Sequence, residues 1–326
     1  MICKEDSMEY VLLTPVRNEE VLLPNAIRSI LSQNQYPALW LIVDDGSTDN
    51  TMQIIHELES SHSWIISKLL PGGLGELQKH FAEVVDGIHF AEVVDNGFRH
   101  LQSEATARGI KYGFIGKIDA DVSFDPTCFS SLINEFEKDP SLGIASPRFI
   151  YCEQGEKGYH NLKEPDRSLS DHPDDPIRLY RRQCFDDIGG IQIVGACETV
   201  AEAKAKLRGW KIHRFDNIYG KHLRRAHSST PLWSRLTQYG SVAYYLGYHP
   251  LLALGRLCFD IFFGRPRYRF LAYAWGYIRG YIKKEPRIDD DEILRYFWSQ
   301  RFQEIVSQLI LNPEVVLFPR REKSSS

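Results

Sequence analysis

The chain has 326 residues, of which 43% are hydrophobic and 25% charged, and its formal net charge is −4. This length fits one catalytic domain with an appendage, and a charge so close to neutral gives no indication of a nucleic-acid partner. Six cysteines lie far apart in the sequence, so their spacing provides neither a zinc knuckle nor a disulfide framework. A polar, acidic N-terminus without signal-peptide features also favours a cytoplasmic protein.

The first sixty residues alternate between apolar runs and stretches of helical spacing. An apolar run at residues 10–14 leads through a polar turn into a helical pattern over residues 21–31. A second run at residues 39–43 leads through another polar turn into a helix over residues 51–60. Repeated strand–turn–helix units predict a parallel α/β sheet. Ligands of such sheets bind at the carboxyl ends of the strands, where both polar turns fall.

A third apolar stretch, residues 112–118, ends in two carboxylates, Asp119 and Asp121. Alternate residues of a strand share a face, so we expect these side chains to converge on one ligand. Paired carboxylates suit Mg²⁺ or Mn²⁺ bridged to a diphosphate, because they neutralise both the ion and the charge that it gathers. Aspartates also occur in ordinary turns and helix caps, so the pair alone is weak evidence for a metal site. The two polar turns upstream strengthen this interpretation.

Three short segments together indicate a family. Residues 14–20 read Thr-Pro-Val-Arg-Asn-Glu-Glu, residues 43–49 read Val-Asp-Asp-Gly-Ser-Thr-Asp, and residues 117–121 read Lys-Ile-Asp-Ala-Asp. In this order and at these intervals they resemble the inverting family 2 glycosyltransferases of the GT-A fold. The resemblance covers roughly the first 225 residues. It implies a Rossmann-like α/β fold with a mixed, mainly parallel sheet flanked by helices.

The resemblance also implies which residues bind the donor. It assigns to the nucleotide the residues Pro15, Arg17, Glu19, Asp45 and Asp119. Arg17 has the forked donor geometry that suits a base carbonyl or a phosphate. Asp45 matches the family position that accepts a hydrogen bond from the base, and Asp119 matches one that contacts the ribose or a metal-bound water. Asp121 would coordinate the metal directly. Glu19 has a second interpretation, as an acid at the start of the following helix.

Inverting transfer requires a general base for the acceptor hydroxyl. The candidate is Glu198, which begins a helical stretch that continues to Leu207. Many relatives carry a Glu-Asp or Trp-Asp pair at this position, whereas Thr199 follows the acid here, so the match is partial. An acid that merely interacts with the helix dipole is the alternative. Glu202 is the second choice for the base.

A basic segment follows a strand-like run at residues 211–215. By resemblance, His222 occupies the place of a histidine that completes the metal shell, and a neutral imidazole favours Mn²⁺ over Mg²⁺. Otherwise it is a solvated histidine in a basic loop. Arg224 and Arg225 are candidates for stabilising the departing diphosphate, or else contribute surface charge.

Two other regions lie between these motifs. Residues 80–86 recur as residues 89–95 with the same sequence, His-Phe-Ala-Glu-Val-Val-Asp. We interpret them as a small tandem duplication in a tolerant loop or helix. Residues 152–176 lack sustained apolar periodicity and predict a long loop between the acidic pair and the proposed base, where it would contact the acceptor.

The resemblance and a change in composition divide the chain into a catalytic domain over residues 1–228 and a helical extension over residues 229–326. The extension is aromatic and basic, with helical patterns at residues 233–248, 250–263 and 289–311. Neither of the first two is long enough to span a bilayer. Its helices either lie on an anionic membrane surface or pack on the catalytic domain with a basic outer face.

The resulting hypothesis is a metal-dependent inverting glycosyltransferase. It would move a sugar from a nucleoside diphosphate donor to a glycan or lipid-linked acceptor, in the synthesis of a cell-surface polysaccharide, with Mn²⁺ or Mg²⁺ as cofactor. A sugar nucleotidyltransferase is one alternative, although the glycine-rich signature of such enzymes is absent from the N-terminal region. A catalytically inactive protein that binds a sugar nucleotide or a glycan is the other.

Overall fold

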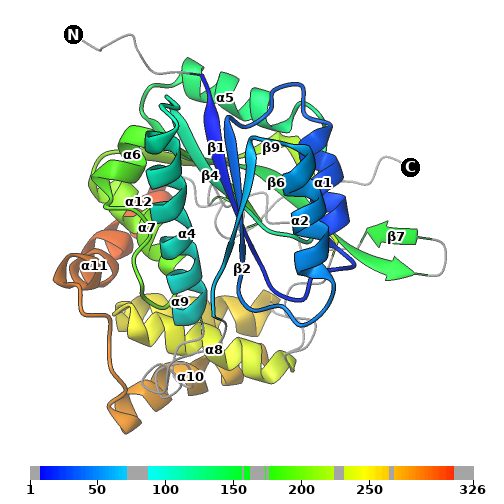
Figure 1. The fold of residues 1–326 in the computed structure, drawn as a ribbon. Coiled ribbons are helices and arrows are strands. Elements are labelled where there is room, and N and C mark those ends of the chain that lie inside the picture. Colours follow the sequence, from blue (N-terminus) through cyan, green and yellow to red (C-terminus); the bar gives the residue numbers. More distant parts are fainter. Residues whose placement is uncertain are drawn as a thin grey trace, which may run out of the picture.

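The computed structural model describes residues 8–71, 87–155, 158–161, 173, 176–223, 231–263 and 268–311. Within these ranges a nine-stranded mixed sheet has the order β3-β2-β1-β4-β8-β6-β9-β5, and β7 pairs with β6 outside this path. Figure 1 shows helices on both sides of the sheet, with α8, α9 and α10 gathered at one end of the molecule. The expected fold, a mainly parallel GT-A-like sheet with C-terminal helices, is confirmed.

The parallel half of the sheet is built from β1 (Tyr10–Val16), β2 (Leu39–Asp44), β3 (Ile65–Leu69) and β4 (Phe114–Ile118). All six residues of β2 are buried, as expected for a parallel strand that is covered on both faces. The helices that connect this half are α1 (Leu23–Leu31), α2 (Thr51–Ser61) and α4 (Ile88–Ala107).

Alternation along β1 separates two hydrophobic cores. Tyr10 and Leu12 pack with α1, α2 and α5 (Cys128–Lys138), whereas Val11 and Leu13 pack with α4 on the opposite face. The helices α6 (Arg182–Asp187) and α7 (Cys197–Leu207) join the second core. Both layers can be followed in Figure 1, where α1 and α4 lie on opposite sides of the sheet.

The other half of the sheet consists of β5 (Val122–Phe124), β6 (Leu142–Gly155), β7 (Gly158–Asn161), β8 (Ile177–Arg181) and β9 (Lys211–His222). The prediction of a loop over residues 152–176 is wrong at its start, because the end of β6 pairs with β7 in an antiparallel hairpin. The residues of this hairpin are mostly polar, so no apolar periodicity indicated its strands. The remainder of the predicted loop lies outside the described residues, apart from positions 173 and 176.

The C-terminal helices are α8 (Leu232–Tyr245), α9 (Pro250–Phe263), α10 (Arg269–Lys283), α11 (Asp291–Arg295) and α12 (Arg301–Leu311). A π-helical turn, Tyr296–Gln300, joins the last two, so the helix expected over residues 289–311 is interrupted. Val200 and Ala203 of α7 share a hydrophobic cluster with Leu246 and Phe297. Among the described residues, no helix combines the length and the apolar character required to cross a bilayer.

Candidate functional site

A cavity of about 290 Å³ lies at the carboxyl ends of β1, β2 and β4. The residues predicted for the nucleotide all line it, together with Asp121: Pro15, Arg17, Glu19, Asp45 and Asp119. Parallel neighbours β1, β2 and β4 end at the same edge, which explains why positions far apart in the sequence meet here. The structure also adds three residues of α4 that the motifs did not indicate, namely His89, Phe90 and Val93.

The two polar turns at this edge are tied to each other. Asn18 adopts a left-handed backbone conformation with φ 55°, and its side-chain oxygen accepts a hydrogen bond of 2.8 Å from the backbone N–H of Thr48. In return, the backbone N–H of Asn18 donates to the Ser47 hydroxyl at 2.9 Å. Gly46, with φ 73°, permits the second turn. These contacts hold the loops of β1 and β2 in a fixed relation around the cavity.

Asp45 contacts two basic side chains that line the cavity. Its Oδ2 lies 3.2 Å from Arg17 Nη1 and 2.6 Å from His89 Nε2. Its neighbour Asp44 accepts a hydrogen bond of 2.6 Å from the backbone N–H of Ser47 and so stabilises the turn. Glu19 lines the cavity, and its backbone carbonyl accepts hydrogen bonds from the N–H groups of Leu22 and Leu23 just before and at the start of α1.

Asp119, Asp121 and His222 form a compact cluster, in which one potential ligand atom from each residue lies within 4.8 Å of the others. His222 Nε2 is 3.4 Å from Asp121 Oδ1. The histidine arrives by strand pairing, because β5 and β9 run antiparallel with Val122 opposite His222. The strand expected at residues 211–215 therefore extends to His222 itself, so the alternative of a solvated histidine in a basic loop is wrong.

The two carboxylates converge for a different reason from the one predicted. β4 ends at Ile118, so Asp119 lies in the turn between β4 and β5 and does not share a strand face with Asp121. Burial raises the pKa of the Asp119 carboxyl, the nearby Lys117 ammonium opposes this rise, and the charge of Asp121 adds to it. Two carboxylates and an imidazole are a donor set that suits Mn²⁺. The residues present therefore fit a divalent cation.

Lys117 connects the acidic pair to the proposed base. Its Nζ is 3.0 Å from Asp119 Oδ1 and 2.8 Å from Glu198 Oε1, and its side chain is only 5% exposed. Glu198 lies in the first turn of α7, which follows Ala196 in a left-handed conformation with φ 54°. Sequence reasoning missed Lys117, although a lysine within an otherwise apolar strand could have indicated a buried partner.

Glu202 has a different environment. Its Oε1 forms a buried ion pair of 2.7 Å with Arg178 Nη2, and the two side chains are 7% and 3% exposed. Arg178 also donates to the backbone carbonyl of Glu198 at 3.4 Å, so the pair anchors the start of α7. The geometry therefore favours Glu198 over Glu202 as the base. Arg224 and Arg225 lie outside the described residues.

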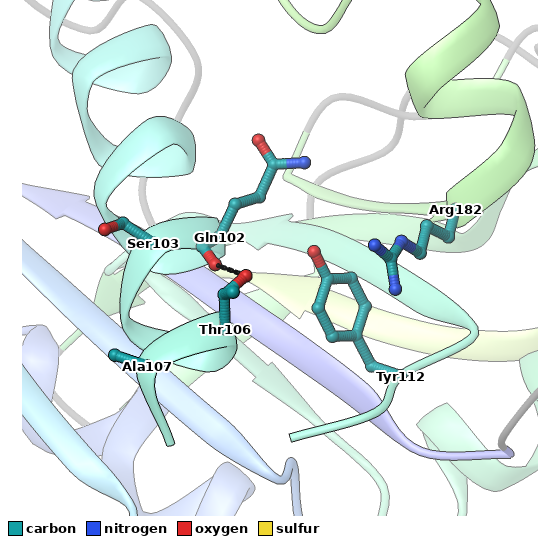
Figure 2. A pocket seen from close by; sticks show the side chains of 6 residues that line it. All are labelled: Gln102, Ser103, Thr106, Ala107, Tyr112 and Arg182. Carbon is teal, nitrogen blue, oxygen red and sulfur yellow. Dashed lines mark hydrogen bonds between the residues drawn. The ribbon is translucent and has the colours of Figure 1, made fainter. Parts of the chain in front are cut away.

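A second hollow, of about 600 Å³, lies at the opposite edge of the sheet, beside the start of β4 (Figure 2). It is lined by Gln102, Ser103, Thr106, Ala107, Tyr112 and Arg182. Figure 2 shows the Tyr112 ring beside Arg182, whose guanidinium carbon is 4.7 Å from the ring centroid. Among the described residues, no carboxylate lines this hollow, in contrast to the first cavity.

Comparison with known proteins identifies the family of the chain. Residues 11–193, more than half of the chain, match the model of Glycosyl transferase family 2, and the chain belongs to this family. A similar curated protein is the poly-beta-1,6-N-acetyl-D-glucosamine synthase of Staphylococcus epidermidis, 26% identical over 132 residues. That match covers 40% of this chain and 26% of the synthase, so the chain spans about a quarter of the length of this relative.

Two solved structures share the fold. A mannosyltransferase from Pyrobaculum calidifontis, PcManGT, in complex with GDP-Man and Mn²⁺, is 13% identical with a TM-score of 0.54, and the match covers 94% of this chain and 82% of that chain. Residues 1–349 of S. aureus TarS are 14% identical with a TM-score of 0.50, covering 92% of this chain and 84% of that chain. At these identities the likeness concerns the fold.

Proposed function

We propose that this protein is an inverting glycosyltransferase that moves a sugar from a nucleoside diphosphate donor to a glycan or lipid-linked acceptor. The observation that carries the proposal is the meeting of Arg17, Asp45 and Asp119 around one cavity, next to a cluster that fits a divalent cation. The residues that would bind the nucleoside thus lie next to those that would hold the cation at the departing diphosphate. The partial likeness to a polysaccharide synthase supports a role in cell-surface polysaccharide synthesis.

The chain's own residues divide the reaction between them. Arg17 and Asp45 would hold the nucleoside, while Asp121 and His222 would hold Mn²⁺ or Mg²⁺, with Asp119 at the ribose or at a metal-bound water. When bound, such a cation neutralises the charge of the departing diphosphate. Glu198 would accept the proton of the acceptor hydroxyl. At the same time the hydroxyl oxygen would attack the anomeric carbon, and the nucleoside diphosphate would leave. Lys117 would keep Glu198 beside the donor site.

A binding screen tests this proposal directly. The purified chain would be heated with UDP, GDP, dTDP or CDP, each with and without Mn²⁺, because a ligand that binds only the folded state raises its melting temperature. We expect Mn²⁺-dependent stabilisation by at least one diphosphate, and its loss in Asp121→Asn. Absence of stabilisation by every diphosphate would contradict the proposal.

Turnover assays separate the two alternatives. A sugar nucleotidyltransferase would consume a sugar phosphate together with a nucleoside triphosphate, and we expect no such turnover. An inactive binding protein would bind the donor without hydrolysing or transferring its sugar. Donor hydrolysis that Asp121→Asn abolishes would exclude the inactive binding protein.

The C-terminal helices favour a lipid-linked acceptor. Four exposed apolar side chains form a stripe along α10, with 49–69% of each accessible, at Leu271, Trp275, Ile278 and Ile282. A second stripe on α9 includes Leu251, Leu254 and Ile261, and the exposed basic residues nearby include Arg256, Lys283 and Lys284. Apolar stripes with basic neighbours suit an anionic membrane surface. We propose that residues 229–326 hold the catalytic domain, residues 1–228, on such a surface.

Vesicle sedimentation tests this part of the proposal. The protein should sediment with vesicles that contain phosphatidylserine more than with purely zwitterionic vesicles. Trp275→Glu and Ile282→Glu together should abolish this binding. Tyr36→Glu is the control. Tyr36 is also an exposed aromatic residue, but it lies beside the start of β1 and not on α9 or α10. Equal sedimentation of all variants would contradict the membrane proposal.

A further inference from the structure

His89 connects the tandem repeat to the donor cavity. It stands in the first turn of α4 and is the first residue of the second copy of the repeat, residues 89–95. Its Nε2 lies 2.6 Å from Asp45 Oδ2, and its Nδ1 lies 3.8 Å from Glu92 Oε2 in the same helix. Asp45 belongs to the turn after β2, so this contact joins two elements that are separated by more than forty residues.

The two oxygens of Asp45 have different surroundings. Oδ2 is contacted by both His89 and Arg17. Oδ1 is buried, and among the described residues it has no hydrogen-bond partner. The residue as a whole is 7% exposed and lines the cavity. A buried carboxylate oxygen without a donor is unfavourable, so a donor supplied by a ligand would complete the site.

This asymmetry restricts the nucleobase. Uracil and thymine present one N–H between two carbonyl oxygens, which matches the single open acceptor Oδ1 with the Arg17 guanidinium beside it as donor. Guanine presents two adjacent donors, N1–H and N2–H₂, and both oxygens of a carboxylate are needed to accept them. Because His89 and Arg17 occupy Oδ2, the second acceptor is not available to guanine.

We infer that His89 is a positioning residue that directs the open oxygen of Asp45 toward the base and thereby selects uracil or thymine over guanine. The inference rests on the proposed function, because it assumes that the nucleoside occupies this cavity. It also gives the second copy of the repeat a place in the donor site, beyond a tolerated duplication. Arg17 alone would leave the carboxylate less constrained, since its side chain is 50% exposed.

The test compares the affinities of UDP, dTDP and GDP in the presence of Mn²⁺, measured by calorimetry on the full chain. We expect the wild-type protein to bind UDP or dTDP at least about tenfold more tightly than GDP, the discrimination that one unpaired buried polar group supplies. His89→Ala should weaken UDP binding by about tenfold and reduce the ratio between UDP and GDP. His89→Gln should restore most of the ratio, because its amide N–H can still donate to Asp45.

The repeat itself provides a matched control. His80 holds the same position in the first copy, so His80→Ala removes an identical side chain from an identical sequence context. We expect its affinities and base preference to equal those of the wild type. Tighter binding of GDP than of UDP and dTDP, or an unchanged ratio in His89→Ala, would overturn the inference while leaving the proposed function intact. Failure of all three diphosphates to bind would overturn the inference, and failure of CDP as well would overturn the proposed function.

Discussion

Lys117 Nζ lies 2.8 Å from Glu198 Oε1, and this contact joins the strand that precedes the acidic pair to the helix that begins with the proposed base. The same ammonium contacts Asp119 Oδ1 at 3.0 Å. The buried Lys117 ammonium therefore contacts two carboxylates, one that we propose for the donor site and one that we propose as the base. Lys117 therefore helps to set the distance between Asp119 and Glu198. The sequence motifs had suggested no role for this lysine.

Removing the Lys117 ammonium should damage both stability and turnover. In Lys117→Met the two carboxylates lose a buried partner, and we expect a destabilisation of about 3 kcal/mol. We also expect kcat to fall by about 100-fold, because misplacement of a reacting group by about 1 Å has effects of that size. Chemical denaturation and initial-rate kinetics measure the two quantities. Lys117→Arg, which keeps the charge, should retain more of both, and full activity in Lys117→Met would show that the contact has no role in turnover.

Glu198 and Glu202 should respond differently to the same substitution. Glu198→Gln should reduce kcat by about 10²–10⁴-fold, the range for loss of a general base, with the affinity for the nucleotide nearly unchanged. Glu202→Gln should lower the free energy of unfolding by about 3 kcal/mol, because it removes the carboxylate from a buried ion pair with Arg178. Kinetics and denaturation on both variants distinguish the roles. The reverse pattern would assign the base to Glu202.

His222 should control the metal requirement. In His222→Ala we expect the Mn²⁺ concentration for half-maximal stabilisation by UDP, or by whichever diphosphate binds, to rise by about tenfold or more. The matched control is His213→Ala, since His213 lies on the same strand but outside the cluster. An unchanged Mn²⁺ requirement in His222→Ala would remove this histidine from the proposed metal site.

The packing of α10 on α8 should be sensitive to one added methyl group. A Cβ on Gly276 would lie only 1.9 Å from the carbonyl oxygen of Thr237, so Gly276→Ala requires the helices to separate and should destabilise the protein by about 2 kcal/mol. A Cβ on Gly255 of α9 would meet nothing within 4 Å. Gly255→Ala should therefore be neutral or stabilise by up to about 1 kcal/mol through helix propensity. Thermal unfolding measures both, and equal melting temperatures would contradict this account of the helix contact.

The local elements of the catalytic half were readable from the sequence because they depend on short-range patterns. Continuous apolar runs marked β1 and β2, and the polar turns after them placed Arg17 and Asp45 at the carboxyl edge of the sheet. Patterns failed where the segments are polar, as in the hairpin of β6 and β7, or where two conformations differ by one residue per turn, as in the π-helical turn at Tyr296–Gln300.

By itself, the sequence indicated the family, the mainly parallel sheet and the cavity residues that belong to the motifs, because these depend on motifs and on hydrophobic periodicity. Only the tertiary structure decided the partners of those residues. His222 reaches Asp121 through the pairing of β9 with β5, Lys117 of β4 reaches Glu198 of α7, and His89 reaches Asp45 from α4. Such contacts join segments tens of residues apart, and long-range pairing in space leaves no periodic signal along the chain.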